Sequence, residues 1–99
     1  MSEHTLYIRK NKKYIGHSTF YLNQKNAIIT DVFIKEEFRG LGYGIKLVKS
    51  VIKYIKTYKN ILKIELDDMS DIHGINNIYY KCGFRYKKLH YGPEMIYKI

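Results

Sequence analysis

Three glycines fall within five residues near the middle of the chain and could form a phosphate-binding turn. They belong to the run Arg39-Gly40-Leu41-Gly42-Tyr43-Gly44, which leads directly into a segment of helical periodicity. Glycines let the backbone approach a ligand closely, and the free N–H groups at a helix start favour a pyrophosphate. Arg39 can add a charge-assisted contact. A tight strand-to-helix turn without any ligand would use the same glycines, so both interpretations stay open on this run alone.

Three other side chains have chemistry suited to proton transfer. Asp31 and Glu65 lie on expected strands, and either carboxylate could take a proton from an amine, directly or through water. The phenol of Tyr79 is protonated at neutral pH and can donate to a leaving group. Each has an ordinary alternative, since carboxylates are often solvated or capping groups and Tyr79 also falls on an apolar stripe.

The remaining reactive residue types predict no site. Cys82 falls on the same apolar stripe with no histidine at a recognisable spacing, so we do not expect it to act as a nucleophile. As the single cysteine it also cannot close an intrachain disulfide. No metal site is predicted, because metal-ligand spacing is lacking among His4, His17, His73 and His90.

Three strands are expected in the first third of the chain, at Thr5–Arg9, Tyr14–Leu22 and Ala27–Ile34. The second alternates between two sets of side chains, as a strand does. The third carries apolar side chains at both odd and even positions, such as Ile28 and Phe33. This pattern is typical of a central strand covered on both faces.

After Tyr43 the apolar positions change to helical spacing. A stripe is formed by Ile45, Val48, Ile52 and Ile55, and most of the lysines lie outside it. The helix should end near Asn60, after which Ile61–Leu66 alternates again. A strand, a helix and a strand with short connections predict a βαβ unit with two parallel strands.

A second helix is expected from Ile72 to Cys82, with Gly83 as its C-terminal stop. Candidate N-caps precede it at Asp67, Asp68, Ser70 and Asp71. Phe84–Leu89 and Glu94–Lys98 should close the sheet as an antiparallel pair. The predicted fold is therefore α/β (α+β), a mixed sheet with two helices in the order β-β-β-α-β-α-β-β, and residues 1–99 form one domain.

Composition narrows the class of protein. Eighteen Lys and Arg against nine Asp and Glu give a net charge of +9, which favours phosphate-bearing partners. An AT-rich genome would also raise the lysine content without any functional demand. With no apolar run long enough for a membrane span and no visible signal peptide, a cytoplasmic protein without a membrane partner is expected.

Two motifs in the right order identify a family. The run Arg39–Gly44 after a central strand resembles the acetyl-CoA site of the GNAT superfamily of N-acetyltransferases. Residues 78–84, Ile-Tyr-Tyr-Lys-Cys-Gly-Phe, resemble that superfamily's Leu-Tyr-Glu-Lys-x-Gly-Phe segment. Within the superfamily, Thr30–Ile34, Lys63–Asp67 and Lys81–Phe84 are most similar to glucosamine-6-phosphate N-acetyltransferases, although Thr30 stands where that subgroup has Glu.

The resemblance implies a transfer of acetyl from acetyl-CoA directly to a primary amine. It implies Tyr79 as the general acid, and Asp31 and Glu65 are the candidate bases. The expected cofactor-binding residues are Val32, Phe33, Ile34, Arg39, Gly40, Leu41, Gly42, Tyr43, Gly44 and Ile45.

The acceptor implied by the subgroup is a small anionic amine, with glucosamine 6-phosphate the first to test. The superfamily's usual first strand and two helices, which help build the acceptor site, have no counterpart before the hairpin. A second subunit could therefore complete the site as a homodimer. Two other functions stay open: a basic nucleic-acid-binding module, which no recognisable motif supports, and a CoA-binding protein of the same fold without turnover.

Overall fold

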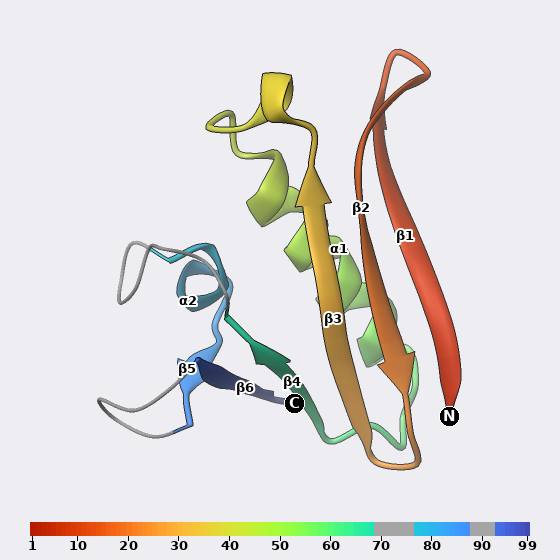
Figure 1. Ribbon diagram of the computed structural model, residues 1–99. Helices are drawn as coiled ribbons and strands as arrows, with labels where there is room; N and C mark the ends of the chain where they lie inside the picture. Colours follow the sequence, from red (N-terminus) through yellow and green to blue (C-terminus); the bar gives the residue numbers. More distant parts are fainter. Residues whose placement is uncertain (69–76, 88–92) are drawn as a thin grey trace.

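The computed structural model describes residues 1–68, 77–87 and 93–99. One six-stranded sheet has the spatial order β1-β2-β3-β4-β6-β5 and packs against helix α1 (Figure 1). The elements are β1 (Ser2–Lys10), β2 (Lys13–Leu22), β3 (Asn26–Ile34), the 3₁₀ helix η1 (Glu36–Phe38), α1 (Tyr43–Lys56), β4 (Lys63–Asp67), α2 (Ile78–Lys81), β5 (Arg85–Tyr86) and β6 (Glu94–Lys98). The predicted order of strands and helices is confirmed.

The first two strands form a long hairpin with a two-residue turn. Asn11 and Lys12 both have positive φ angles, 51° and 66°, between the paired residues Lys10 and Lys13. Two left-handed residues match the right-handed twist of the flanking strands, and Asn tolerates this conformation better than most side chains. The strand β1 extends beyond the predicted Thr5–Arg9 at both ends.

An irregularity in β3 corrects the expectation that this strand is covered on both faces. Thr19 pairs with Asp31 and Phe20 pairs with Ile29, so Thr30 is an extra residue on β3. This β-bulge shifts the alternation by one residue, which sends Thr30 and Asp31 to the same face. Ile28 before the bulge and Phe33 after it are 36% and 38% exposed, although their apolar character predicted burial.

The core lies between the sheet and α1. Leu47, Val48, Val51, Ile52 and Ile55 of the helix are buried, and they meet the inward side chains of the central strands. The predicted βαβ unit is confirmed, because β3 and β4 are parallel neighbours joined through α1. No helix within the described part of the chain has the length and apolar character needed to cross a membrane.

The second helix differs from its prediction at its N-terminal end. α2 begins at Ile78, because Asn77 is extended and its side-chain oxygen accepts the N–H groups of Tyr79 and Tyr80. The N-cap is therefore Asn77 and not one of the aspartates, since an amide oxygen directly before the turn can bind these donors. The predicted start at Ile72 lies outside the described residues. Gly83 has φ of 105° and ends the helix as expected.

Candidate active site

The end of β3 separates from its parallel neighbour. The ladder between β3 and β4 joins residues 26–29 to residues 63–66, whereas β3 continues to Ile34. Figure 1 shows β4 leaving β3 in the direction of α2. The separation begins at the Thr30 bulge, because an extra residue locally disrupts the ladder and bends the strand. The backbone of Val32–Ile34 is thereby left facing an opening between the two strands.

The glycine loop lies beside this opening. Gly40 and Gly42 have φ angles of 76° and 88°, a left-handed conformation that glycine adopts without steric cost. Gly42 is also the N-cap of α1, and no acidic residue occupies the first turn of this helix. The first N–H groups of the helix therefore point outward with no intrahelical partner, an arrangement that suits an anion.

Arg39 connects the loop to the strand. Its Nε donates to the backbone oxygen of Ile34 at 2.8 Å, and its guanidinium carbon lies 5.7 Å from the centre of the Phe33 ring. The side chain thus folds back over the end of β3 and places a permanent positive charge beside the glycine loop.

One cavity of about 600 Å³ joins these parts. Its wall comes from three places that are far apart in the sequence: the end of β3, the glycine loop with the start of α1, and the start of α2. The lining residues are Val32, Phe33, Ile34, Phe38, Arg39, Gly40, Gly42, Gly44, Ile45, Asn77, Ile78, Tyr79 and Lys81. Of the predicted cofactor-binding residues, Leu41 and Tyr43 are not in the wall, and Leu41 is 65% exposed.

Tyr79 lines this cavity and is held by packing. Its ring meets Phe84 edge-on, with centroids 6.2 Å apart. Burial, together with the negative charges of Asp68 and Asp31, raises the pKa of Tyr79 to about 12. The phenol is therefore fully protonated at neutral pH and available as a hydrogen-bond donor.

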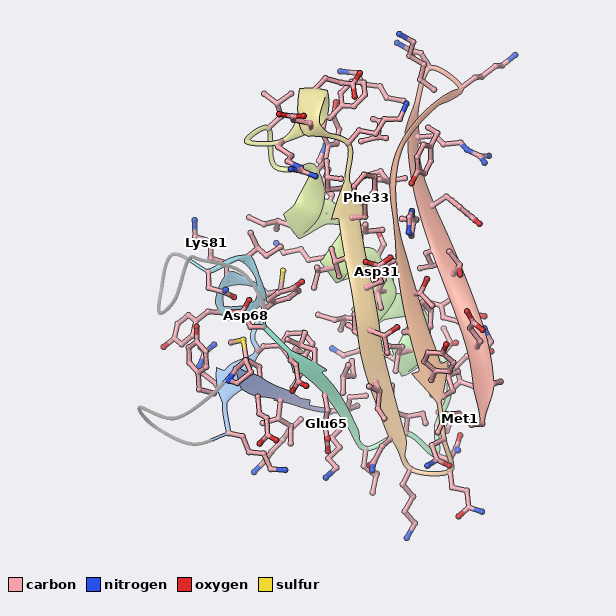
Figure 2. The ribbon with its side chains drawn as sticks, in the orientation of Figure 1. Met1, Asp31, Phe33, Glu65, Asp68 and Lys81 are labelled. Atoms are coloured by element: carbon pink, nitrogen blue, oxygen red, sulfur yellow. The ribbon has the colours of Figure 1, made fainter. Side chains whose placement is uncertain are left out.

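The two candidate bases occupy different places (Figure 2). Asp31 lies on β3 beyond the end of the ladder, next to Val32 of the cavity wall, and its side chain is half exposed. Glu65 lies on β4 opposite Ile28 and is paired with Lys63 at 2.9 Å. It lines a second cavity of about 430 Å³, together with Thr30 and Glu94. Of these two carboxylates, Asp31 but not Glu65 is among the charges that raise the pKa of Tyr79.

Sequence reasoning missed the roles of two polar residues around these sites, Asn77 and His17. Asn77 caps α2, lines the larger cavity and donates through Nδ2 to the carboxylate of Asp68 at 2.7 Å; both side chains are buried. His17 donates from Nε2 to Asp31 at 2.9 Å. An N-cap signal before Ile78 could have pointed to Asn77, but cross-strand contacts such as that of His17 leave no local signal.

Metal chemistry finds no support in the part of the chain that the structure describes. No three side chains among its His, Cys, Asp and Glu residues are arranged to hold an ion. His73 and His90 lie outside the described residues.

Comparisons with known proteins agree with this architecture. An N-acetyltransferase (PaiA) of Thermoplasma acidophilum, solved in complex with coenzyme A, is similar with a TM-score of 0.76 and 22% identity, covering 98% of this chain and 61% of that one. This chain thus spans less than two thirds of that protein. A GNAT acetyltransferase of Elizabethkingia anophelis with acetyl-CoA bound has a TM-score of 0.81, 21% identity and coverages of 99% and 77%.

The ribosomal-protein-S18-alanine N-acetyltransferase of Escherichia coli is similar at a TM-score of 0.81 and 15% identity, covering 98% and 69% of the two chains. At these identities the likeness concerns the fold. No match was found among curated proteins. The profile described as "Acetyltransferase (GNAT) family" matches residues 1–84. On that match over most of its length, the chain belongs to the GNAT acetyltransferase family.

Proposed function

We propose that this protein is an acetyl-CoA-dependent N-acetyltransferase that moves the acetyl group directly to a primary amine. The observation that carries the proposal is the single cavity shared by the end of β3, the glycine loop and Tyr79. It brings together a backbone edge, an anion-binding helix start and a proton donor. These are the three features that an acyl thioester with a pyrophosphate would require.

The residues present fit acetyl-CoA. At Gly42 an added Cβ would meet no atom within 4 Å, yet φ of 88° excludes most side chains, so the backbone there stays bare and accessible. We assign the pyrophosphate to the N–H groups at the start of α1 and to Arg39, and the pantetheine arm to the backbone of Val32–Ile34. When bound, acetyl-CoA supplies a thioester whose C–S bond breaks as the amine forms the new C–N bond.

Two side chains of this protein would take part in hydrogen bonding and proton transfer. Tyr79 would donate a hydrogen bond to the sulfur as it gains negative charge, and Asp31 would accept the proton that the amine loses. Glu65 remains the second candidate base for an acceptor in the smaller cavity. Its ion pair with Lys63 would have to open before it took part.

For the acceptor we propose a small anionic amine, with an amino-sugar phosphate as the first choice. The net charge of +9 supports this class, because a basic surface attracts phosphate. We further propose that a second subunit completes the acceptor site.

Thermal denaturation with and without acetyl-CoA tests the cofactor. A ligand at 100 times its Kd that binds only the folded state stabilises it by about 2.7 kcal/mol, which should raise the Tm of a domain of this size by roughly 10 °C or more. Absence of a shift, together with a salt-sensitive mobility shift of DNA or RNA, would favour the nucleic-acid-binding module instead.

Release of free thiol from acetyl-CoA tests the reaction. We expect it to depend on an amine and to be fastest with glucosamine 6-phosphate in a panel that includes glucosamine, spermidine and an N-terminal peptide. If kcat/KM for glucosamine 6-phosphate is no higher than for glucosamine, the proposed acceptor class is wrong, but the proposed transferase activity is not contradicted. A Tm shift without turnover on any amine would leave a CoA-binding protein.

A further inference from the structure

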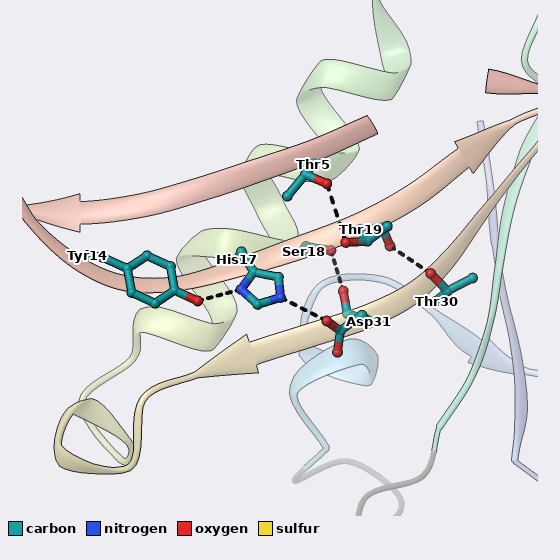
Figure 3. A network of polar contacts seen from close by, with 7 residues as sticks. All are labelled: Thr5, Tyr14, His17, Ser18, Thr19, Thr30 and Asp31. Carbon is teal, nitrogen blue, oxygen red and sulfur yellow. Dashed lines mark hydrogen bonds and ion pairs between the residues drawn. The ribbon is translucent and has the colours of Figure 1, made fainter. Parts of the chain in front are cut away.

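A chain of hydrogen bonds crosses the face of the sheet opposite α1 (Figure 3). The imidazole of His17 contacts the Tyr14 hydroxyl through Nδ1 and the Asp31 carboxylate through Nε2, the latter at 2.9 Å. The histidine side chain is 28% exposed and that of Asp31 is 51% exposed. The three residues come from two neighbouring strands, so the sheet itself fixes their spacing.

These contacts determine which nitrogen of neutral His17 carries the proton. A carboxylate only accepts hydrogen bonds, so Nε2 must be the N–H that donates to Asp31. Nδ1 is then the acceptor of the Tyr14 hydroxyl. Aromatic rings hold the imidazole in this orientation, since Tyr14 stacks on it at 18° and Phe33 lies 5.6 Å from its centre.

Asp31 is fixed at two points. His17 engages carboxylate oxygen Oδ2, and the buried Ser18 hydroxyl donates to the Asp31 backbone oxygen at 2.8 Å. This residue follows the Thr30 bulge, where β3 leaves β4, and precedes Val32 in the cavity wall. Its charge is also among those that raise the pKa of Tyr79. Asp31 is not among the residues that line the cavity, but it directly precedes Val32 of the cavity wall and its charge reaches Tyr79.

We propose that His17 is a positioning residue that holds Asp31 as the base for the acceptor amine. This inference rests on the transferase function proposed above. The N–H bond of the ammonium breaks and an O–H bond forms at Oδ1 of Asp31, because Oδ2 stays with the imidazole. The nitrogen lone pair is then free to attack the thioester carbon.

The imidazole orients the carboxylate, because its Nε2–H donates to Oδ2 and leaves Oδ1 for the acceptor amine. Other polar or charged groups around the imidazole and its ring neighbours are Tyr7, Arg9, Tyr14, Lys35 and Arg39.

The kcat values of two His17 variants test the inference, measured at pH ~8 by thiol release with the fastest amine of the panel at saturation. His17→Gln keeps an N–H donor for Asp31 and should retain most of the wild-type kcat. His17→Phe should lower kcat about tenfold or more at pH ~8 with the KM for acetyl-CoA nearly unchanged.

Two controls separate this role from general destabilisation. His4 lies on the face packed against α1, stacked on Phe20, and His4→Gln should leave kcat nearly unchanged. Asp31→Asn should remove most of the activity, and adding His17→Phe to it should lower kcat no further, since both act through one group. If His17→Phe lowers kcat by the same factor in the Asp31→Asn variant as in the wild type, the inference is overturned.

The possible failures are distinct. Equal kcat values for the wild type and His17→Phe, with amine-dependent turnover intact, would contradict the role of His17 and leave the transferase function standing. If the wild type turns over no amine of the panel, the transferase function fails and this inference fails with it. In that case the Tm shift with acetyl-CoA still reports whether the cofactor binds.

Discussion

At the level of single residues, the fold changes the acidity of the Tyr79 phenol. Its pKa of about 12 guarantees a protonated phenol, but it also makes the phenol a weaker acid than an ordinary tyrosine. A thiol ordinarily has a pKa of about 8.5, so complete proton transfer from Tyr79 to a thiolate would be unfavourable. The group is better suited to stabilising the sulfur through a hydrogen bond as negative charge develops.

The first prediction concerns that hydroxyl. Tyr79→Phe keeps the ring packed against Phe84 and removes only the donor, so turnover should fall by roughly 10²–10⁴-fold. The acetyl-CoA-dependent rise in Tm should change little, because the ring still fills the same space. Steady-state kinetics and thermal denaturation measure the two effects, with Tyr80→Phe on the same helix as the matched control. Equal activity of the Tyr79 variant would reduce this residue to a packing role.

The same pKa predicts a loss of stability in alkali. Because the folded chain holds the Tyr79 proton up to about pH 12 and an unfolded tyrosine loses it near pH 10, the free energy of unfolding should fall as the pH rises through this window. Urea denaturation at about pH 8.5, 10 and 11 measures the decline. It should be shallower in Tyr79→Phe. Part of it should remain, since the hydrogen bond with Tyr58 and burial also raise the pKa of Tyr54. A decline of equal size in both proteins would contradict the buried phenol.

Residues that carry a local signal could be found from the sequence, and residues that act across strands could not. Tyr79 and Arg39 belong to contiguous motifs and both line the cavity. Asp31 was identified by its strand position, but its partner His17 is 14 residues away in the sequence. Their contact depends on the register of β2 against β3, which a bulge shifts by one residue. Alternating side chains predict a strand but do not predict its register.

At the scale of elements, the glycine loop and α1 form one unit. Gly42 combines a left-handed backbone with the N-cap position, so two different substitutions at this residue can separate the effect of conformation from that of charge. Asp and Asn have nearly the same shape, and both tolerate the left-handed region better than most residues. They differ in the negative charge that Asp would place at the start of the helix.

We therefore predict different outcomes for Gly42→Asp and Gly42→Asn. The aspartate should abolish the acetyl-CoA-dependent rise in Tm, because its charge would repel a pyrophosphate at the helix start. The asparagine should keep most of the rise, although both variants are expected to unfold at a lower temperature than the wild type. Equal ligand-induced shifts in the two variants would contradict the assignment of this loop to the phosphates.

Elements with strong periodicity were predicted well, and short elements were not. The stripe of α1 and the parallel pairing of β3 with β4 followed from the sequence. The start of α2 did not, because this helix spans only residues 78–81 and its apolar stripe is too short to reveal where it begins. The exposed positions of Ile28 and Phe33 were missed because apolar side chains at alternating positions predict burial on both faces, whereas these two side chains are partly exposed. For Phe33 the extra residue Thr30 also changes the alternation, and nothing in the local sequence indicates that bulge.

At the scale of the whole molecule, the positive net charge has a clear physical consequence for the binding of anionic ligands. The lysines of α1 are exposed on the side away from the core: Lys46, Lys49, Lys53 and Lys56. The start of this helix is the proposed pyrophosphate site. A net charge of +9 should therefore raise the association rate of an anionic ligand, whether the lysines were selected for function or follow from genome composition.

The last prediction is that binding of acetyl-CoA weakens with salt through its association rate. Raising NaCl from about 20 to about 300 mM shortens the Debye length from roughly 20 Å to below 10 Å, which screens the lysines from an approaching phosphate. Stopped-flow measurements should show a falling association rate and a nearly constant dissociation rate. Acetyl-pantetheine carries the same thioester without phosphates, so its association should be almost independent of salt. If both ligands respond equally, the positive surface does not steer the cofactor. The high lysine content would then reflect either genome composition or attraction of an anionic acceptor. Comparing the KM of glucosamine 6-phosphate with that of glucosamine at the two salt concentrations would distinguish these causes.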